Sequence, residues 1–289
     1  MKTLRDIRKE YINLMNKSGI KSAAFDFDYI LSECFGISKT VQLSDTELCL
    51  PEHKLEVLNQ MIHRYITGEP LQYILGYVWF MDSKFCTDSH VLIPRSDTEI
   101  ICEYTIQAIK DKKKSVSILD LCSGSGCIGI SILKACPESA LVMADISEYA
   151  VALSQKNAAE IIPGLNYKVI KSDLFSALPD TKFDIIVSNP PYIASRMINE
   201  LEDRVKKHEP RLALDGGTDG LCIYRKIINE APVHLDCDGI LVLEIGYDQA
   251  DAVRDLLEHG HFTDIKLMKD YGGNYRLAAA CLSSSSKTV

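Results

Sequence analysis

The chain has 289 residues, of which 46% are hydrophobic and 25% charged, a composition typical of globular proteins and a length sufficient for two domains. Its formal net charge of −8 offers no broad basic surface, so direct nucleic-acid binding is not expected. The ten cysteines form no C-x-x-C pair, which argues against a zinc site or a disulfide framework and favours reduced thiols in the cytoplasm. We expect no metal. No stretch approaches the roughly 18 apolar residues of a membrane span, so no membrane partner is expected.

The N-terminal quarter of the chain has the pattern of amphipathic helices. In residues 1–67, apolar side chains such as Leu4, Ile7 and Tyr11 recur at helical spacing. This pattern predicts a small N-terminal helical domain. Residues 68–95 are rich in aromatic and β-branched side chains, which indicates a hairpin or linker.

Residues 96–289 are predicted to form the main domain. The sequence SDTE at 96–99 is a capping box and predicts a helix to about residue 110. Apolar strands then alternate with glycine turns and helical patterns; the candidates are 117–121, 140–145, 167–172, 183–188, 239–245, 263–268 and 276–281. The last two are joined by a turn too short for a parallel crossover. We therefore expect an α/β, Rossmann-like fold whose seven-stranded sheet is mostly parallel with the last strand antiparallel. The tail at 283–286 is expected to fray.

A glycine turn follows the first predicted strand. LDLCSGSGCIG, residues 119–129, contains Gly124-x-Gly126-x-x-Gly129, which matches the dinucleotide fingerprint. Glycine allows close approach of the backbone to a ligand, and the following helix N-terminus attracts an anion. Asp145 ends the next strand, where a carboxylate can accept hydrogen bonds from both ribose hydroxyls. Turn and acid together predict a nucleoside cofactor with an anionic end, either NAD or S-adenosylmethionine.

Two features favour S-adenosylmethionine over NAD. Asp120 precedes the turn, where its charge could pair with the cofactor's amino group but would repel a pyrophosphate. The antiparallel last strand also suits a methyltransferase sheet better than a parallel dehydrogenase sheet.

The sequence Asn-Pro-Pro-Tyr at 189–192 leaves the fourth predicted strand of the sheet. The prolines make this turn rigid and remove two N–H donors. The Asn189 side chain and the Pro190 carbonyl each offer an acceptor oxygen, and Tyr192 adds a flat apolar face. Two fixed acceptors can hold both hydrogens of a planar –NH₂ group, either a nucleobase amine or the side-chain amide of Gln or Asn.

This arrangement suits methyl transfer to nitrogen. An amide or aryl amine is a poor nucleophile, so alignment of the reacting atoms matters more than a strong base. As positive charge moves onto the nitrogen, acceptor oxygens that face its N–H groups stabilise the transition state.

With these motifs, the chain resembles the HemK/PrmC family, the S-adenosylmethionine-dependent N5-glutamine methyltransferases of peptide chain release factors. The resemblance covers nearly the whole sequence; it includes GEPLQYILG (68–76), LIPRSDTE (92–99), LDLCSGSG (119–126), ADIS (144–147), SDLF (172–175), VSNPPYI (187–193), EPRLALDGGTDGL (209–221) and LEIG (243–246). NPPY also occurs in nucleic-acid amine methyltransferases, whereas GEPLQYILG together with the EP…DGGTDGL loop is much more specific.

The resemblance implies roles for individual residues. The implied cofactor contacts are Asp120, Cys122, Ser123, Gly124, Ser125, Gly126, Asp145, Asp173, Leu174 and Asn189. Asn189 and Pro190 would be the catalytic pair that holds the substrate amide, with Pro191 and Tyr192 completing the substrate site. The implied methyl acceptor is the glutamine of a release factor's Gly-Gly-Gln motif, and the N-terminal helical domain would help to bind that partner.

Two departures and two alternatives accompany this interpretation. The family usually has glycine at the position of Cys122 and often proline at that of Ser96. The alternatives are a nucleic-acid exocyclic-amine methyltransferase, acting on adenine N6 or guanine N2, and a non-catalytic cofactor-binding module. Glu209-Pro210 and residues 215–220 form a glycine-rich loop, which is either a structural turn or part of the substrate mouth. Glu244, at a strand end, is either a satisfied core acid or a site residue.

Overall fold

The computed structural model describes residues 2–282, and the chain divides into two compact units, Met1–Gly76 and Tyr77–Val289. The sequence pattern places the end of the helical domain at residue 67. The structure extends it, because the short helix α5 (Leu71–Leu75) packs Ile74 into the helical core. The tail at 283–286 lies outside the described residues.

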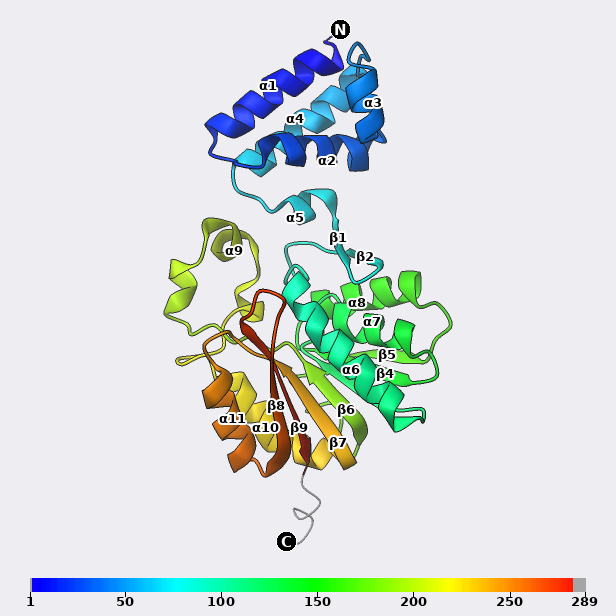
Figure 1. The fold of residues 1–289 in the computed structure, drawn as a ribbon, viewed down its shortest axis with the longest axis vertical. Helices are drawn as coiled ribbons and strands as arrows, with labels where there is room; N and C mark the ends of the chain where they lie inside the picture. The colour runs from blue at the N-terminus through cyan, green and yellow to red at the C-terminus, as the bar shows by residue number, and fades with distance from the viewer. Residues whose placement is uncertain (1, 283–289) are drawn as a thin grey trace. The chain divides into compact units, whose positions relative to one another are not determined.

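The first unit is built from amphipathic helices (Figure 1). Before α5 these are α1 (Leu4–Lys17), α2 (Ala23–Phe35), α3 (Lys39–Ser44) and α4 (Glu52–Ile66). Local sequence sets their ends: the Thr3 hydroxyl accepts a hydrogen bond from the Asp6 N–H at 3.3 Å, and Gly36 ends α2 at φ 68°. Their apolar faces meet in one core that includes Ile7, Phe27, Leu31, Leu58 and Ile62. The predicted helical domain is confirmed.

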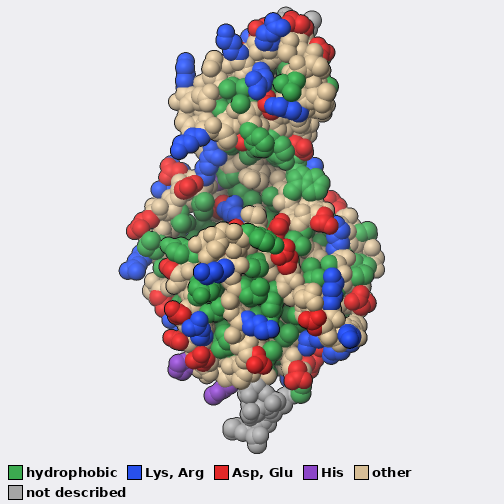
Figure 2. Space-filling model, viewed as in Figure 1, with side chains coloured by type: hydrophobic (Ala, Val, Ile, Leu, Met, Phe, Trp, Pro, Cys, Tyr) green, Lys and Arg blue, Asp and Glu red, His purple; other side chains and the backbone are tan. Residues whose placement is uncertain are grey.

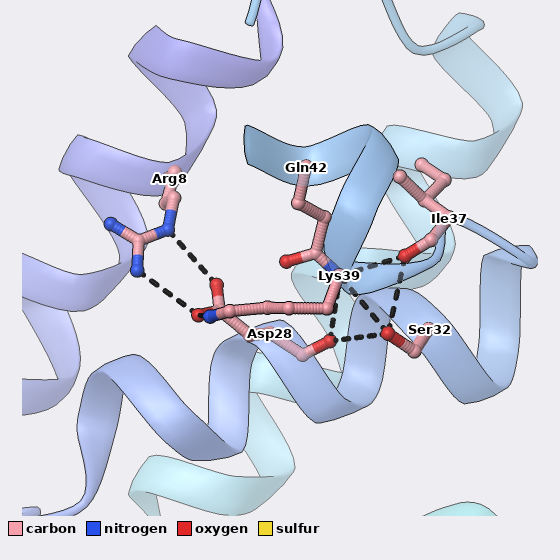
Figure 3. A network of polar contacts seen from close by, with 6 residues as sticks. All are labelled: Arg8, Asp28, Ser32, Ile37, Lys39 and Gln42. Atoms are coloured by element: carbon pink, nitrogen blue, oxygen red, sulfur yellow. Dashed lines mark hydrogen bonds and ion pairs between the residues drawn. The ribbon is translucent and has the colours of Figure 1, made fainter. Parts of the chain in front are cut away.

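A polar network joins α1, α2 and α3 around Asp28 (Figure 3). Arg8 donates from Nε and Nη2 to the two Asp28 oxygens at 2.9 and 3.0 Å, and Lys39 pairs with the same carboxylate. Gln42 donates to the backbone carbonyls of Asp28 at 2.9 Å and Ile37 at 2.7 Å. Burial alone would raise the pKa of Asp28, but the bonds from Arg8 and Lys39 outweigh it and the pKa is lowered.

The second unit contains a seven-stranded sheet in the order β5-β4-β3-β6-β7-β9-β8 (Figure 1). The strands are β3 (Ser117–Leu121), β4 (Ala140–Asp145), β5 (Tyr167–Lys171), β6 (Phe183–Ser188), β7 (Leu235–Glu244), β8 (Phe262–Lys269) and β9 (Tyr275–Leu282). The strands from β5 across to β7 are parallel, and β9 runs antiparallel to both β7 and β8. The predicted sheet, with its antiparallel last strand, is confirmed.

Strand β7 begins earlier than the sequence suggests. It starts at Leu235, which pairs with Phe183, whereas the apolar pattern begins at residue 239. The register shifts between Phe183 and Ile185, and Asp238 has φ 60°. This irregularity interrupts the alternation that marks a strand in the sequence.

The two faces of the sheet carry separate apolar layers. Neighbouring strand residues alternate between them: Ile118 belongs to one core and Leu119 to the other. Helices α6 (Glu99–Lys112), α7 (Cys127–Ala135) and α8 (Glu148–Ile161) lie on one face, and α10 (Cys222–His234) and α11 (Ala250–His259) on the other (Figure 1). Within residues 2–282, none of the helices combines the length and apolar character needed to cross a bilayer.

The predicted hairpin-or-linker region divides between the two units. Its first part forms α5, and its middle forms an antiparallel hairpin of β1 (Tyr77–Phe80) and β2 (Ser83–Cys86). The remaining irregular segment leads to the short helix η1 (Ser96–Thr98), which precedes α6.

The capping box predicted at SDTE is wrong in detail. Neither η1 nor α6 has a side-chain cap hydrogen bond. The Thr98 hydroxyl donates instead to Glu244 Oε2 at 2.6 Å, and Glu99 Oε1 accepts from the Met81 N–H at 2.8 Å. Tertiary partners therefore take the side chains that the local pattern assigns to the cap.

A long segment without strands connects β6 to α10. It contains the short helices η2 (Met197–Glu200), α9 (Asp203–His208) and η3 (Arg211–Ala213). It starts with the Asn-Pro-Pro-Tyr turn and ends with the glycine-rich loop, so both motifs lie between the same two elements of the sheet unit.

Candidate active site

A pocket opens at the carboxyl ends of the parallel strands. Its walls include the segments that follow β3, β4, β5 and β6, namely 122–125, 145–147, 172–174 and Asn189. Parallel strands present their carboxyl ends at one edge of a sheet, which is where ligands bind in such folds. Of the predicted site residues, the pocket lining includes Cys122, Ser123, Gly124, Ser125, Asp145, Asp173, Leu174, Asn189 and Pro191. The lining does not include the other four predicted residues, Asp120, Gly126, Pro190 and Tyr192.

Asp145 holds the glycine turn in place. Its Oδ2 accepts a hydrogen bond from the Gly124 N–H at 2.9 Å, and its Oδ1 accepts from the Ser147 N–H at 2.9 Å. Gly124 has φ 55°, and a Cβ added there would point into open space, so the turn is hollow on that side. Burial raises the pKa of Asp145 despite these two bonds. The acid and the turn therefore form one preorganised wall.

Two non-glycine residues in this wall have left-handed backbone. Cys122 has φ 58° and Leu174 has φ 47°. Side chains disfavour this conformation by about 1–2 kcal/mol. The angle at Cys122 explains physically why a glycine suits that position.

Asp120 lies beneath the turn and is fully buried. Its Oδ2 accepts a hydrogen bond from the Gly129 N–H at 2.9 Å, whereas its Oδ1 is buried without a partner among the described residues. A Cβ on Gly129 would lie 2.9 Å from Oδ2, so only glycine lets α7 approach this closely. Burial raises the pKa of Asp120 to about 7.

The Asn-Pro-Pro-Tyr turn carries two possible acceptor oxygens, those of the Asn189 side chain and the Pro190 carbonyl. Asn189 is half-buried at the end of β6 and Pro190 is buried. Within residues 2–282, neither the Asn189 side chain nor the Pro190 carbonyl accepts a hydrogen bond. Tyr192 points away from the pocket lining: its hydroxyl donates to Glu244 Oε1 at 3.2 Å.

The glycine-rich loop packs directly against this turn. The Ile193 N–H donates to the Leu214 carbonyl at 3.0 Å, and the Gly216 N–H donates back to the Ile193 carbonyl at 2.9 Å. A Cβ on Gly216 would lie 2.7 Å from Tyr192 Cα, and one on Gly220 would lie 2.4 Å from the Tyr192 carbonyl oxygen. The loop therefore needs glycine at both positions, and it supports the turn from behind. Its neighbouring residues Leu212, Ala213 and Asp215 line the pocket.

Sequence reasoning did not identify the residues of the opposite wall. Thr98 and Arg95 line the pocket, Arg95 pairs with the buried Glu209, and Thr98 binds Glu244. Both pairs join segments more than one hundred residues apart, so no local spacing reveals them. The only signal in the sequence is that LIPRSDTE, EPRLALDGG and LEIG are among the motifs that carry the family resemblance.

We also searched the described residues for clusters of possible metal ligands. The part of the chain that the structure describes contains no cluster of three or more His, Cys, Asp or Glu side chains suited to an ion. Burial raises the pKa of the Cys122 and Cys127 thiols to about 12, so both remain protonated at neutral pH. On the visible face of the sheet unit, Lys and Arg side chains are interspersed with Asp and Glu (Figure 2).

Two families match parts of the chain. Residues 102–216 match the family described as methyltransferase small domain, which includes the glycine turn, Asp145 and the Asn-Pro-Pro-Tyr turn. Residues 6–76 match the family described as PrmC N-terminal domain, and this span ends where the helical unit ends.

Relatives of known name match nearly the whole length. A release factor glutamine methyltransferase from Geobacter sulfurreducens is 34% identical over 271 residues, which are 94% of this chain and 94% of the relative. One from Fusobacterium nucleatum subsp. nucleatum is 36% identical over 286 residues, covering 96% of this chain and 80% of the relative. A third, from Clostridium botulinum, is 35% identical over 279 residues, covering 96% of this chain and 98% of the relative.

Solved structures support the fold. A 16S rRNA N2 methyltransferase from T. thermophilus, in complex with AdoMet and guanosine, superposes with a TM-score of 0.52 at 17% identity, covering 72% of this chain and 50% of that one. At this identity the likeness concerns the fold alone.

Proposed function

Because this chain belongs to the family of release factor glutamine methyltransferases, we propose that it methylates the side-chain amide nitrogen of a glutamine in peptide chain release factors. The methyl donor is S-adenosylmethionine, and the acceptor is the glutamine of the Gly-Gly-Gln motif. One observation carries the proposal: Asn189, whose side chain accepts no hydrogen bond within residues 2–282, lines the same pocket as the glycine turn and Asp145. The Pro190 carbonyl, which also accepts none there, follows it directly in the chain.

The residues present fit such a cofactor. Asp145 still has lone pairs for ribose hydroxyls, and the space beside Gly124 leaves room for the ligand. Ser123, in the pocket lining, has a buried hydroxyl without a partner among the described residues, a polar atom available to a ligand. The N-terminus of α7 favours a carboxylate. We assign Asp173 and Leu174, on the same wall, to the nucleobase.

Asp120 has a different role in this proposal from the one that the sequence suggested. Its Oδ2 holds the start of α7, and its Oδ1 is buried below the pocket lining. We therefore assign it to supporting the turn and to setting the local negative potential, which favours the cofactor's amino group and sulfonium from a distance.

The chain's contribution to the reaction is alignment and electrostatic stabilisation. The cofactor, when bound, supplies an electrophilic sulfonium methyl group. Asn189 Oδ1 and the Pro190 carbonyl accept the two amide hydrogens, which turns the nitrogen lone pair towards the donor. Methyl transfer would place positive charge on the nitrogen, and these two oxygens would stabilise that charge until the proton passes to solvent. No strong base is needed, because the nitrogen becomes acidic only after transfer.

The helical unit has a separate role in the proposal. We assign it to binding the body of the release factor, since the pocket residues all belong to the sheet unit. Translation takes place in the cytoplasm, and we place the reaction there.

The test is mass spectrometry of a release factor incubated with the enzyme and methyl-labelled S-adenosylmethionine. We expect one added methyl group on the glutamine of Gly-Gly-Gln. A release factor in which this glutamine is replaced by alanine is the control and should gain none. Labelling of DNA or ribosomal RNA with no labelling of the release factor would reject the proposal in favour of a nucleic-acid amine substrate.

A further inference from the structure

Glu244 lies directly beside the acceptor turn. It is the last residue of β7, and Ser188, which precedes Asn189, pairs with Leu243, which precedes Glu244. The Glu244 residue is 3% exposed. Its carboxylate therefore sits under the edge of the sheet where the pocket opens, although it does not line the pocket itself.

Two hydroxyl groups from different segments converge on this carboxylate. Thr98 Oγ1 donates to Oε2 at 2.6 Å, and the Tyr192 hydroxyl donates to Oε1 at 3.2 Å. Thr98 belongs to the pocket wall and Tyr192 to the acceptor turn. Glu244 thus connects the two sides of the proposed substrate site through one side chain.

Tyr192 is held at its other end as well. Gln249 Nε2 donates to the Tyr192 carbonyl at 2.9 Å, and Gln249 Oε1 accepts from the Gly246 N–H at 3.0 Å. The Tyr224 hydroxyl donates to the Glu244 carbonyl at 2.8 Å, which fixes the end of β7. With both its carbonyl and its phenol held, Tyr192 has little freedom to rotate.

No direct ion pair with Glu244 is formed within residues 2–282. The nearby Arg276 pairs with Asp270 at 3.2 Å and Asp97 at 3.6 Å, and its Nη1 lies 3.5 Å from the Tyr192 hydroxyl. Burial raises the pKa of Glu244 to about 7, so an ionised acid at this place reduces stability. A glutamine of the same size would avoid that cost, which argues that the acid has a role beyond packing.

We propose that Glu244 is a positioning residue, whose carboxylate fixes the Tyr192 and Thr98 hydroxyls and thereby the geometry of the Asn189–Pro190 acceptor pair. This inference rests on the proposed function. It assigns no contact between Glu244 and the substrate.

The proposal predicts a pH dependence. As a carboxylate, Glu244 accepts charge-assisted hydrogen bonds from both hydroxyls, whereas the protonated acid is neutral and turns one oxygen into a donor, so both contacts weaken. The titratable and charged groups around it are Asp97, Cys102, Cys127, Tyr192, Tyr224 and Arg276. Burial and neighbouring acids raise the pKa of the Tyr192 and Tyr224 hydroxyls and of the two thiols, so these stay neutral, and Arg276 stays charged. Turnover should therefore rise as the pH increases through about 7.

The first experiment compares Glu244→Gln, Tyr192→Phe and the double variant in methyl transfer to a Gly-Gly-Gln release factor between pH 5.5 and about 9. We expect each single variant to lower kcat about tenfold, because each removes one hydrogen bond to a charged group. KM and cofactor affinity should change little. The double variant should lose no more than either single one, because both remove the same contact. The rise in turnover near pH 7 should vanish in Glu244→Gln. Glu258→Gln, an exposed acid on α11, is the matched control.

The positioning role would be overturned if Glu244→Gln kept the wild-type kcat and pH profile. Additive losses of kcat in the double variant would overturn it as well. Tyr192→Phe removes a single oxygen atom and covers the case in which Glu244→Gln folds poorly.

A second measurement separates this inference from the proposed function. Hydrogen exchange of the full chain without substrate should show faster exchange at the amides of residues 192–195 in Glu244→Gln than in the wild type. Unchanged exchange there would overturn the positioning role whatever the enzyme methylates. Absence of wild-type methyl transfer to the release factor would reject the proposed function alone.

Discussion

In the helical unit, Asp28 is buried between Arg8 and Lys39, and its pKa is lowered. In the sheet unit, Asp120 and Glu244 are buried without a direct ion pair among the described residues, and burial raises the pKa of each to about 7. Both units thus bury acids, but Asp28 is paired with cations, whereas Asp120 and Glu244 are not paired with a cation among the described residues.

The contrast separates two uses of a buried carboxylate. Arg8 and Lys39 pair with the Asp28 carboxylate and Gln42 binds the Asp28 backbone carbonyl, so the network joins three helices. Asp120 and Glu244 lie behind a pocket wall and retain negative potential that faces it. Buried acids that lie at a cleft without a paired cation mark functional sites, whereas acids that are paired with cations more often serve structure.

The largest effect should come from removing an acceptor in the sheet unit. Replacing Asn189 with Ala should reduce turnover by about 10²–10³-fold, as for the loss of one preorganised transition-state contact. Cofactor affinity should stay within about twofold of the wild type, since the main cofactor wall is the glycine turn and Asp145. Single-turnover methyl transfer and calorimetric titration measure the two quantities. Asn199→Ala, at an exposed position, is the control, and unchanged turnover in Asn189→Ala would contradict the assignment.

The pH dependence of stability should distinguish the uncompensated acids. Because the folded pKa of Asp120 is raised above that of the unfolded chain, its stabilising contribution is complete below about pH 4 and is lost as the pH rises through about 7. The wild type should lose about 4 kcal/mol of unfolding free energy through this group between pH 4 and 8, and Asp120→Asn should remove that loss. Urea unfolding at a series of pH values tests this. A variant whose stability falls with pH as steeply as that of the wild type would show that Asp120 does not titrate in this range.

The helical unit should respond in the opposite direction. The folded pKa of Asp28 is lowered, so its contribution is present above the unfolded pKa and is lost as the pH falls through the folded value. Replacing both Arg8 and Lys39 with Met leaves Asp28 buried without cations and should destabilise this unit by roughly 1–3 kcal/mol, because both cations are partly exposed. Hydrogen exchange of α1 to α3 measures the change.

Asp28→Asn on the background of both replacements is the control for that experiment. It should recover part of the stability, since the isolated charge is gone. No recovery would show that the cations act through their aliphatic stems rather than through the carboxylate.

The smallest effect concerns the left-handed residue in the glycine turn. Cys122→Gly should raise the free energy of unfolding by at most about 1 kcal/mol, because the gain at φ 58° is partly offset by the greater entropy of the unfolded chain. Cys122→Val should lower it, since a β-branched side chain tolerates this backbone less well. Thermal unfolding of the two variants should shift in opposite directions. Shifts of the same sign would indicate that packing of the thiol dominates.

The sequence predicts which segments form the site, because their positions follow from the order of the strands. Parallel strands bring the residues after each strand to one edge, which is why the Gly124 N–H and Asp145 Oδ2, far apart in the chain, lie 2.9 Å apart. The Asn-Pro-Pro-Tyr turn is predictable for the same reason. Its position depends only on the end of β6.

The sequence does not predict which side chains hold those segments in place. The bond from Thr98 to Glu244 and the pair of Arg95 with Glu209 depend on how distant segments pack, and no local spacing encodes them. The capping-box pattern misleads because its Thr98 and Glu99 find stronger partners elsewhere in the unit. Likewise, the full burial of Asp120, whose Oδ2 accepts from the Gly129 N–H, follows from three-dimensional packing alone.

Gly216 and Gly220 touch the backbone of Tyr192 so closely that not even one methyl carbon fits between them. A mutation in the glycine-rich loop therefore disturbs the Asn-Pro-Pro-Tyr turn, and the reverse also holds. The two segments cannot diverge separately over evolutionary time. A lineage that acquires a new methyl acceptor must remodel the loop and the turn together, or else obtain its new specificity from surfaces outside both.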